Sequence, residues 1–372
     1  MAGELRIFLA GDVMTGRGVD QVLACPGDPE LREAAIRDAR DYVRLAEAVN
    51  GHIPRAADPA WPWGDALPAL DAWQPHVRLI NVETSATTSD DFAPGKAVHY
   101  RMHPGNVATL TAARPDACAL ANNHVLDFGI SGLEETLDAL DQAGLHHVGA
   151  GRDEEQAWRP LALPAGDHRV LVWSVGTASS GVPARWAARP DRPGVAFLGL
   201  TEADATDLGE RVRRAKRPGD LAVVSVHWGS NWGYDVPRGH VRFAHRLVDC
   251  GVDVVHGHSS HHPRPVEVYR DRLVLYGCGD LVNDYEGIGS YPRFRDDLRL
   301  LYFADLRPDG RLDQLRMVPL ESRQLRLHRA TAPDTRWLRR ALHRASRPYG
   351  SHIDLDADGS LLLRRRQADL AG

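Results

Sequence analysis

Leu5-Arg6-Ile7-Phe8-Leu9-Ala10 is a short apolar run that leads directly into Gly11-Asp12. A run of this length with a polar, glycine-containing end is typical of a buried β-strand that stops at a turn. Similar runs recur along the chain, and we predict further strands at residues 77–81, 117–120, 147–149, 170–174, 221–226, 252–256, 266–269 and 273–276.

Helical patterns separate several of these runs, at residues 30–49, 133–143, 202–216 and 238–250. Ser131-x-x-Glu134 has the spacing of a capping box for the second helix. Alternating strands and helices predict an α/β fold with strands covered on both faces. Near the end, residues 298–306 and 315–327 are predicted as antiparallel strands and 336–345 as a basic helix. We therefore expect a main domain at 1–330 and a helical and strand extension at 331–372 packed on it.

Composition argues against several classes of protein. The 372 residues carry 45 Lys+Arg and 50 Asp+Glu, a formal net charge of -5, which does not favour binding to nucleic acid. Four cysteines without a CxxC pair argue against a disulfide framework or a zinc knuckle. Neither a signal-type segment nor a long apolar stretch is found, so we expect a cytoplasmic protein with no membrane partner.

Polar residues collect directly after the predicted strands, where open α/β sheets place their ligand sites. The groups are Gly11-Asp12, Asn81-Val82-Glu83, Asn122-Asn123-His124 with Asp127, His227-Trp228-Gly229, His256 to His262, and Gly277-Cys278-Gly279-Asp280. Each group alone also fits an ordinary turn or a buried core histidine. Together they place Asp, Glu, Asn and His at six strand ends, and these are ligands that suit divalent cations. We predict one site, holding one or two metal ions.

The order of these motifs resembles the CapA/PgsA (poly-γ-glutamate capsule synthesis) family, a branch of the calcineurin-like metallophosphoesterases. The resemblance spans roughly residues 5–318 and implies a four-layer α/β sandwich, with two mixed sheets flanked by helices and metal at the strand ends. It also implies metal ligands at Asp12, Glu83, Asn123, His227, His258 and His261. His124 matches the general-acid histidine of the family, and Asp127 is placed to orient it.

Three positions depart from that pattern. The Asp-x-His motif reads Asp12-Val13-Met14, and a thioether is a poor ligand for a hard cation. The closing His-x-His is replaced by His258-Ser259-Ser260-His261, and Asp280 adds a carboxylate. The sequence also resembles CapA-like lasso-peptide epimerases of the MslH type. This second resemblance implies inversion of the Cα of a C-terminal residue, such as Trp, in a ribosomal precursor peptide, with His/Asp pairs acting around Ca²⁺.

Epimerisation needs two proton carriers on opposite faces of one carbon and a positive charge that stabilises the enolate. His124 with Asp127 is the first predicted pair. His261 or His258, with Asp12 or Asp280, is the second. The assignments compete, because a histidine bound to metal is not a free proton carrier. We expect Ca²⁺, with Mn²⁺, Zn²⁺ or Fe²⁺ as alternatives, and no organic cofactor.

Substrate-binding residues are predicted from position alone. Trp228, Trp232 and Tyr234 follow His227, and residues 50–68, with Trp61 and Trp63, suit a surface loop or lid. These aromatic rings fit either a wall for an apolar side chain or ordinary core packing. Arg17, Arg293 and Arg295 are candidates for binding a peptide carboxylate.

Two other functions stay open at this point. One is a metallophosphoesterase-type hydrolase, and the other is an accessory protein of γ-polyglutamate or capsule synthesis. The sequence leaves the oligomeric state undecided.

Overall fold

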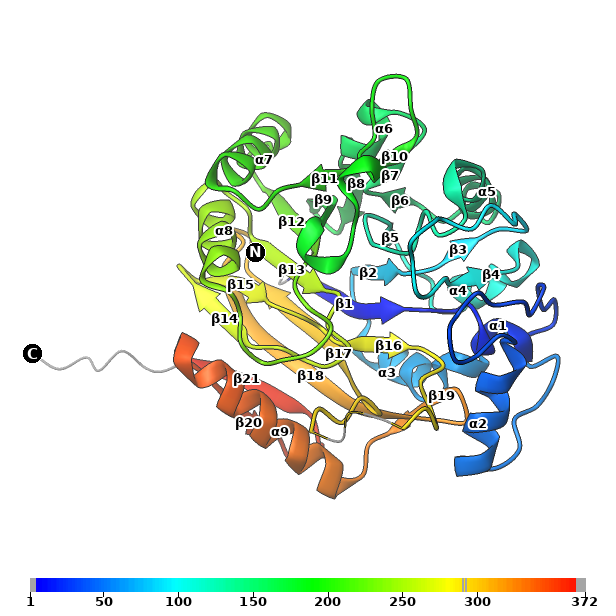
Figure 1. The fold of residues 1–372 in the computed structure, drawn as a ribbon. Helices are drawn as coiled ribbons and strands as arrows, with labels where there is room; N and C mark the ends of the chain where they lie inside the picture. Colours follow the sequence, from blue (N-terminus) through cyan, green and yellow to red (C-terminus); the bar gives the residue numbers. More distant parts are fainter. Residues whose placement is uncertain (1–4, 290, 292, 366–372) are drawn as a thin grey trace, which may run out of the picture.

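Two β-sheets face each other in the protein, and helices cover their outer sides (Figure 1). The computed structural model describes residues 5–289, 291 and 293–365. Residues 1–4, in front of the predicted first strand, and residues 366–372, at the end of the predicted extension, lie outside the described residues. No helix in the described ranges is long and apolar enough to cross a membrane.

The first sheet has ten strands and contains both ends of the described chain. β1, β2, β5 and β6 run parallel, whereas β17, β18, β21 and β20 continue the sheet in antiparallel pairs. Its strands are β1 (Leu5–Val13), β2 (Val77–Val82), β5 (Ala117–Ala119), β6 (His147–Val148), β16 (Asp280–Val282), β17 (Leu298–Leu306), β18 (Leu312–Arg323), β19 (Arg326–Arg329), β20 (Ser351–Leu355) and β21 (Leu361–Arg365).

The second sheet has seven strands in the order β11-β9-β12-β13-β15-β14, with β8 paired to β9. Its central strands β9, β12, β13 and β15 are parallel, so their carboxyl ends meet at one edge. The strands are β8 (Leu161–Ala165), β9 (His168–Thr177), β11 (Phe197–Leu198), β12 (Asp220–His227), β13 (Val254–His258), β14 (Val266–Tyr269) and β15 (Arg272–Leu275). Two small sheets pair β3 (Ser85–Ala86) with β4 (Arg101–Met102) and β7 (Ala150–Gly151) with β10 (Gly194–Val195).

Nine α-helices are found in the described ranges. They are α1 (Gly18–Val22), α2 (Arg40–Asn50), α3 (Ala66–Trp73), α4 (Ala108–Thr111), α5 (Gly129–Gln142), α6 (Glu154–Trp158), α7 (Glu202–Ala215), α8 (Arg238–Asp249) and α9 (Ala332–Ser346).

Side-chain alternation along β1 explains the layers. Leu9 joins the apolar cluster between the two sheets, whereas Phe8 joins a second cluster that also contains residues of α3 and α5. A third cluster packs α7 and α8 on the outer face of the second sheet, through residues such as Leu208 and Phe243. The order is therefore helices, sheet, sheet, helices, which confirms the predicted four-layer α/β sandwich. α9 contributes Leu338 and Leu342 to the central cluster.

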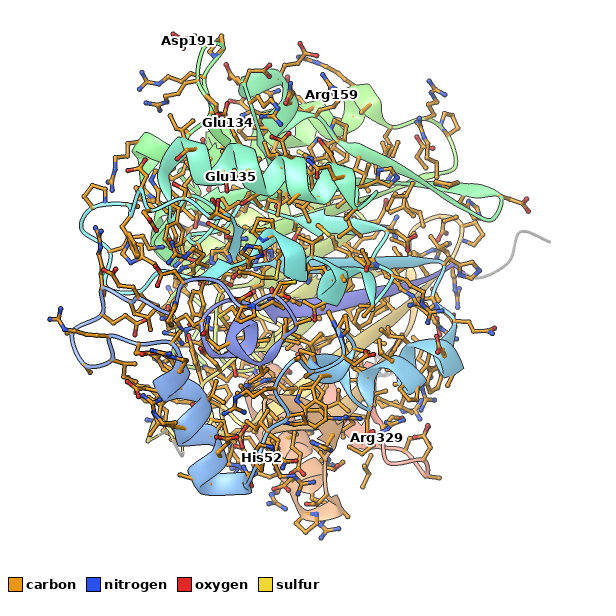
Figure 2. The ribbon with its side chains drawn as sticks, turned by 90° about the vertical axis from the view of Figure 1, so that its right-hand side faces the viewer. His52, Glu134, Glu135, Arg159, Asp191 and Arg329 are labelled. Carbon is orange, nitrogen blue, oxygen red and sulfur yellow. The ribbon has the colours of Figure 1, made fainter. Side chains whose placement is uncertain are left out.

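Four local predictions are wrong in whole or in part. The helix predicted at 30–49 begins only at Arg40, because Glu33 turns inward to bind Arg17 and Asp38 accepts a hydrogen bond from the Arg40 backbone nitrogen. Ser131 does not cap α5, which already begins at Gly129. Instead, the Ser131 hydroxyl donates to the carbonyl of Phe128, and Glu134 lies on the outer side of α5 near Arg152 (Figure 2).

The third prediction, a surface loop or lid at residues 50–68, holds for the largely exposed segment 51–58 but is wrong for Trp61 and Trp63. Trp63 is fully buried and its indole nitrogen donates to the Thr109 carbonyl at 2.6 Å. Trp61 packs beside Leu325 and donates to the Gln324 carbonyl at 3.0 Å. Apolar burial and two satisfied indole donors make both residues structural. The strand predicted at 315–327 is also divided, because Gln324 and Leu325 turn the chain between β18 and β19.

Gly11 lets β1 approach the segment before β16 closely enough to place Asp12. A β-carbon at position 11 would stand 1.7 Å from the carbonyl oxygen of Gly279, and that oxygen accepts a hydrogen bond from the Asp12 backbone nitrogen. Only glycine fits this contact, since the obstructing atom is backbone and cannot rotate away.

We predict that Gly11→Ala lowers the free energy of unfolding by about 2–4 kcal/mol, because the two backbones must separate. Denaturant unfolding followed by circular dichroism measures it. Gly239→Ala in α8 is the matched control, since no atom lies within 4 Å of its added carbon. Equal stability of the two variants would contradict the close approach of β1.

Candidate metal centre

Three strand ends bring Asp12, His227 and His258 together. Asp12 lies near the end of β1, and His227 and His258 end the neighbouring strands β12 and β13, where they are paired in register. One ligand atom from each lies within 4.8 Å of the others, and all three residues are fully buried. The predicted convergence of distant strand ends is therefore confirmed for these residues.

Glu83 and Asn123 border the same cluster. The Asn123 side-chain oxygen lies 3.0 Å from His227 Nε2, and Glu83 Oε1 lies 3.7 Å from the same nitrogen. His261 lies apart from the three-residue cluster, with its Nδ1 2.9 Å from Asp280. The ligand roles of Glu83, Asn123 and His261 stay predictions. Met14 is fully buried, and its backbone nitrogen donates to the carbonyl of Val282.

The cluster has the chemistry of a cation site. Burial, followed by repulsion from Asp280, raises the pKa of Asp12 to about 7. Burial and the charges of Asp12 and Asp280 raise the pKa of Glu83 well above its usual value. Burial lowers the pKa of His227 and of His258 well below the usual value, so both imidazoles are neutral and have a lone pair to offer. A divalent cation would neutralise the crowded carboxylates and use both imidazoles, so these residues fit a bound metal.

Two further hydrogen bonds orient Asp12. Asn81 donates its side-chain amide to one carboxyl oxygen at 2.7 Å, and the backbone nitrogen of Ser259 donates to the other at 3.1 Å. Asn81 is held in turn by Asn122, whose amide lies 3.2 Å from the Asn81 oxygen. Polar partners of this kind fix the geometry of a ligating carboxylate.

His124 and Asp127 form the first predicted pair. His124 Nδ1 lies 2.6 Å from Asp127 Oδ2, and its Nε2 faces Glu83 at 3.7 Å. The ammonium of Lys96 forms an ion pair with the buried Asp127, and the Tyr100 backbone nitrogen donates to the same carboxylate at 2.7 Å. Burial is the main cause that lowers the pKa of His124 to about 4. His124 is therefore neutral near pH 7, with Nε2 turned toward the cluster.

His261 and Asp280 form a second pair, in which the pKa of the imidazole shifts in the opposite direction to that of His124. Asn283 fixes the other Asp280 oxygen at 2.7 Å. Burial disfavours a charged imidazole, but the carboxylates of Asp280 and Asp12 together outweigh it and raise the pKa of His261. Two tyrosines connect the pairs. The Tyr285 hydroxyl lies 3.5 Å from His261 Nε2 and accepts a hydrogen bond from the Tyr100 hydroxyl. The Tyr100 ring packs edge-on against His124.

The predicted substrate residues are divided among three places. Trp232 lines a cavity of about 250 Å³ together with His261 and Tyr285. Arg17 lines it too, but its guanidinium is buried and bonded to Asp284, Glu33 and Tyr42. Tyr234 and Arg293 line a different cavity.

Trp228 and Arg295 do not form part of a substrate wall. Trp228 is buried between His240 and Tyr276 and donates its indole N–H to the Tyr276 carbonyl, so its predicted substrate role is wrong. Arg295 is paired with Asp297 and Asp334.

The sequence analysis missed four residues that shape the site: Lys96, Tyr100, Asn283 and Tyr285. Lys96 and Tyr100 belong to the chain between β3 and β4, which carries no apolar pattern that would place it. Asn283 and Tyr285 follow closely after Asp280, the polar residue that ends the Gly277–Asp280 motif. Their position next to this motif would have identified them as candidates.

Known proteins are similar in sequence to this chain over much of its length. The sequence model described as "Bacterial capsule synthesis protein PGA_cap" matches residues 6–285. The chain belongs to this family. A Mycobacterium tuberculosis protein named "Probable polyglutamine synthesis accessory protein" is 54% identical over 368 residues, covering 97% of both chains. This PGA_cap family member is also similar to "PGA biosynthesis protein CapA" of Bacillus subtilis, with 26% identity over 63% of this chain and 59% of the relative.

A solved structure, that of the 5'-nucleotidase precursor from Thermus thermophilus, also aligns with this PGA_cap family member. The TM-score is 0.49 and the identity is 16%, over 93% of this chain and 59% of that chain.

We predict that Asp12→Asn lowers the affinity for divalent metal at least about tenfold, because it removes the carboxylate of the cluster. Protons compete for the same oxygen, so the apparent affinity of the wild type falls about tenfold per pH unit below the pKa of Asp12. Isothermal titration calorimetry with Mn²⁺, Zn²⁺ and Ca²⁺ measures both effects.

His245→Gln is the control for this prediction, since His245 contacts Glu267 away from the cluster. Unchanged affinity in Asp12→Asn, or an affinity that does not vary between acidic and neutral pH, would show that Asp12 is not a ligand.

Proposed function

We propose that the protein is a metal-dependent hydrolase that assists the synthesis of a capsule-type polymer of glutamate units. The observation that carries this proposal is the buried Asp12, His227 and His258 cluster with the neutral His124 directed toward its edge. The family match and the names of the relatives support the polymer context, since a 54% identical protein bears the name of an accessory protein.

The donor set favours a transition metal over Ca²⁺. Ca²⁺ is bound by about six to eight oxygen ligands, whereas this cluster offers two imidazoles and one carboxylate. Imidazole suits Zn²⁺ and Fe²⁺, so we propose Mn²⁺, Zn²⁺ or Fe²⁺ rather than the Ca²⁺ expected from the epimerase resemblance. When bound, the cation would supply Lewis-acid activation of the bond that is cleaved.

The pKa values of the two histidines shift in the opposite directions that a general base and a general acid of hydrolysis need. Asp127 accepts the Nδ1 proton of His124, which leaves Nε2 free to take a proton from the attacking water. His261, whose pKa the carboxylates of Asp280 and Asp12 raise despite its burial, is the group that gives a proton to the leaving group. The water oxygen forms the new bond while the bond to the leaving group breaks, so the charges balance between the two imidazoles.

We predict that His124→Asn lowers kcat for hydrolysis by about 10²–10⁴-fold, since it removes the proton acceptor. Metal-loaded protein is assayed with bis(4-nitrophenyl) phosphate and with poly-γ-glutamate. These substrates test cleavage of a phosphodiester bond and of an amide bond, the two bond types that the proposal allows. His245→Gln keeps wild-type turnover. Absence of turnover of both substrates by metal-loaded wild type, or equal rates for His124→Asn, would end the hydrolase proposal.

A second candidate is the peptide epimerase acting on a ribosomal precursor peptide. The specific observation in its favour is the presence of two His/Asp pairs, joined through the hydrogen bond between Tyr100 and Tyr285. One imidazole with a lowered pKa and one with a raised pKa suit the need for one group that removes a proton and another that returns it.

Epimerisation predicts deuterium incorporation at the C-terminal Cα when protein and a C-terminally aromatic peptide are incubated in D₂O. Mass spectrometry measures the exchange, and we expect it to be lost in both His124→Asn and His261→Asn. Hydrolysis without Cα exchange excludes this candidate and leaves the hydrolase.

A further inference from the structure

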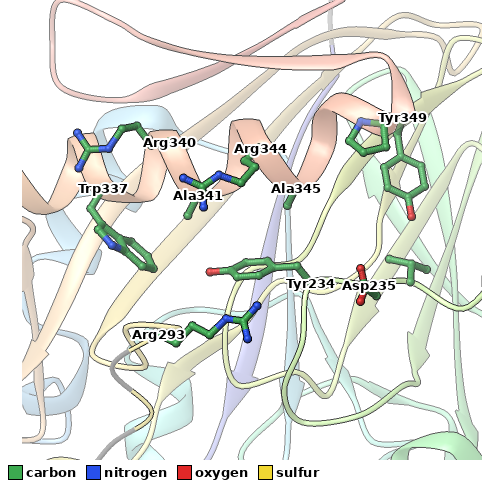
Figure 3. A pocket seen from close by; sticks show the side chains of 11 residues that line it. Tyr234, Asp235, Arg293, Trp337, Arg340, Ala341, Arg344, Ala345 and Tyr349 are labelled. Carbon is green, nitrogen blue, oxygen red and sulfur yellow. The ribbon is translucent and has the colours of Figure 1, made fainter.

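A second cavity, separate from the metal centre, is rich in arginine. It measures about 530 Å³ and lies between α9 and the segments that carry Tyr234 and Arg293 (Figure 3). Arg340 and Arg344 reach it from α9, and Arg293 reaches it from the other side. Figure 3 shows Arg344 and Arg293 on either side of the Tyr234 ring. Three exposed arginines from two distant parts of the sequence therefore line one hollow.

These arginines lack acidic partners. In the described part of the chain, no hydrogen bond or ion pair to a carboxylate is found for Arg293, Arg340 or Arg344. Neighbouring Arg295, by contrast, is paired with two aspartates. The pocket contains Asp235, whose charge acts on the buried Arg264 and on Tyr349.

Positive charge concentrated in this way attracts anions, although the whole chain has a formal charge of -5. The phenol of Tyr234 experiences this field. Burial raises the pKa of Tyr234, and the charges of Arg344 and Arg293 act in the opposite direction. Guanidinium groups bind carboxylates in a bidentate manner, and rings such as Trp337 and Tyr234 offer flat surfaces for the aliphatic part of a chain.

An aromatic wall separates this cavity from the one beside the metal centre. Trp232 packs against His261 at a ring distance of 5.3 Å and against Phe294 at 5.6 Å. Tyr234, on the other side, packs against Phe294 at 5.5 Å. Three rings in successive contact, Trp232, Phe294 and Tyr234, therefore lie between His261 and the arginine cavity.

We propose that the arginine cavity binds an acidic peptide chain, with a carboxylate on each residue, and holds the part of a polymer that extends away from the metal centre. Charge complementarity favours a carboxylate polymer, and a run of three aromatic rings connects the cavity with His261. This inference rests on the proposed function, because it assigns a second binding site to the polymer on which the metal centre is proposed to act.

Binding of γ-linked oligoglutamate to the full chain, measured by isothermal titration calorimetry, tests the proposal. We expect Arg340→Ala/Arg344→Ala to weaken binding by about tenfold or more, with a weaker dependence on salt than wild type. Arg336→Ala/Arg213→Ala removes the same charge from exposed positions outside the cavity and changes the affinity less than about twofold. Thermal melting of both double variants confirms that they are folded.

Two other ligands, oligoglutamine and tripolyphosphate, test whether the cavity recognises the carboxylates of the chain. Oligoglutamine of the same length should not bind, because it lacks the carboxylates. Equal binding of oligoglutamate by both double variants, or displacement by tripolyphosphate at lower concentration than by oligoglutamate, would overturn the proposal. If binding depends on the arginines but the protein shows no hydrolytic activity, the binding site is supported and the hydrolase proposal is rejected.

Discussion

Three carboxyl groups are buried where β1 meets its neighbours, and the repulsion among them governs the centre of the molecule. Asp12 and Asp280 are partners in the parallel pairing of β1 and β16, and Glu83 follows β2 directly. Burying like charges without a counter-ion is costly, so such a site holds protons, a cation or both. The raised pKa values of Asp12 and Glu83 show that protonation is one way to relieve the repulsion. A bound divalent cation is the other way.

The fold imposes this crowding through backbone contacts. Gly11 allows the backbone at Gly279 to approach β1. Asp280 therefore lies opposite Asp12 in the parallel pairing of β1 and β16. The second sheet then presents His227 and His258 from adjacent parallel strands. The two sheets thus contribute different chemistry: carboxylates come from the first and imidazoles from the second. The apolar cluster between the two sheets holds together the edges that carry these residues.

Much of this could be predicted because the ligands follow buried strands, whose apolar runs are visible in the sequence. Asp12, His227 and His258 were identified in this way. Trp228 was misassigned because the residue after His227 points to the opposite side, into the packing of α8. Lys96 and Tyr100 were missed since their positions depend on contacts with Asp127, about thirty residues later, which no local pattern encodes. The predicted role of Arg17 in binding a substrate carboxylate stays a prediction, and its ion pairs with Asp284 and Glu33 had no signal in the local sequence.

The central claim is that Asp12, His227 and His258 bind one divalent cation between the sheets. The most direct measurement is anomalous X-ray diffraction from crystals soaked in Mn²⁺, with data collected on both sides of the manganese absorption edge. The account predicts a strong anomalous peak bordered by the Asp12 carboxylate and by ring nitrogens of His227 and His258. A peak at another place, or none at these three side chains in crystals that contain manganese, would contradict it.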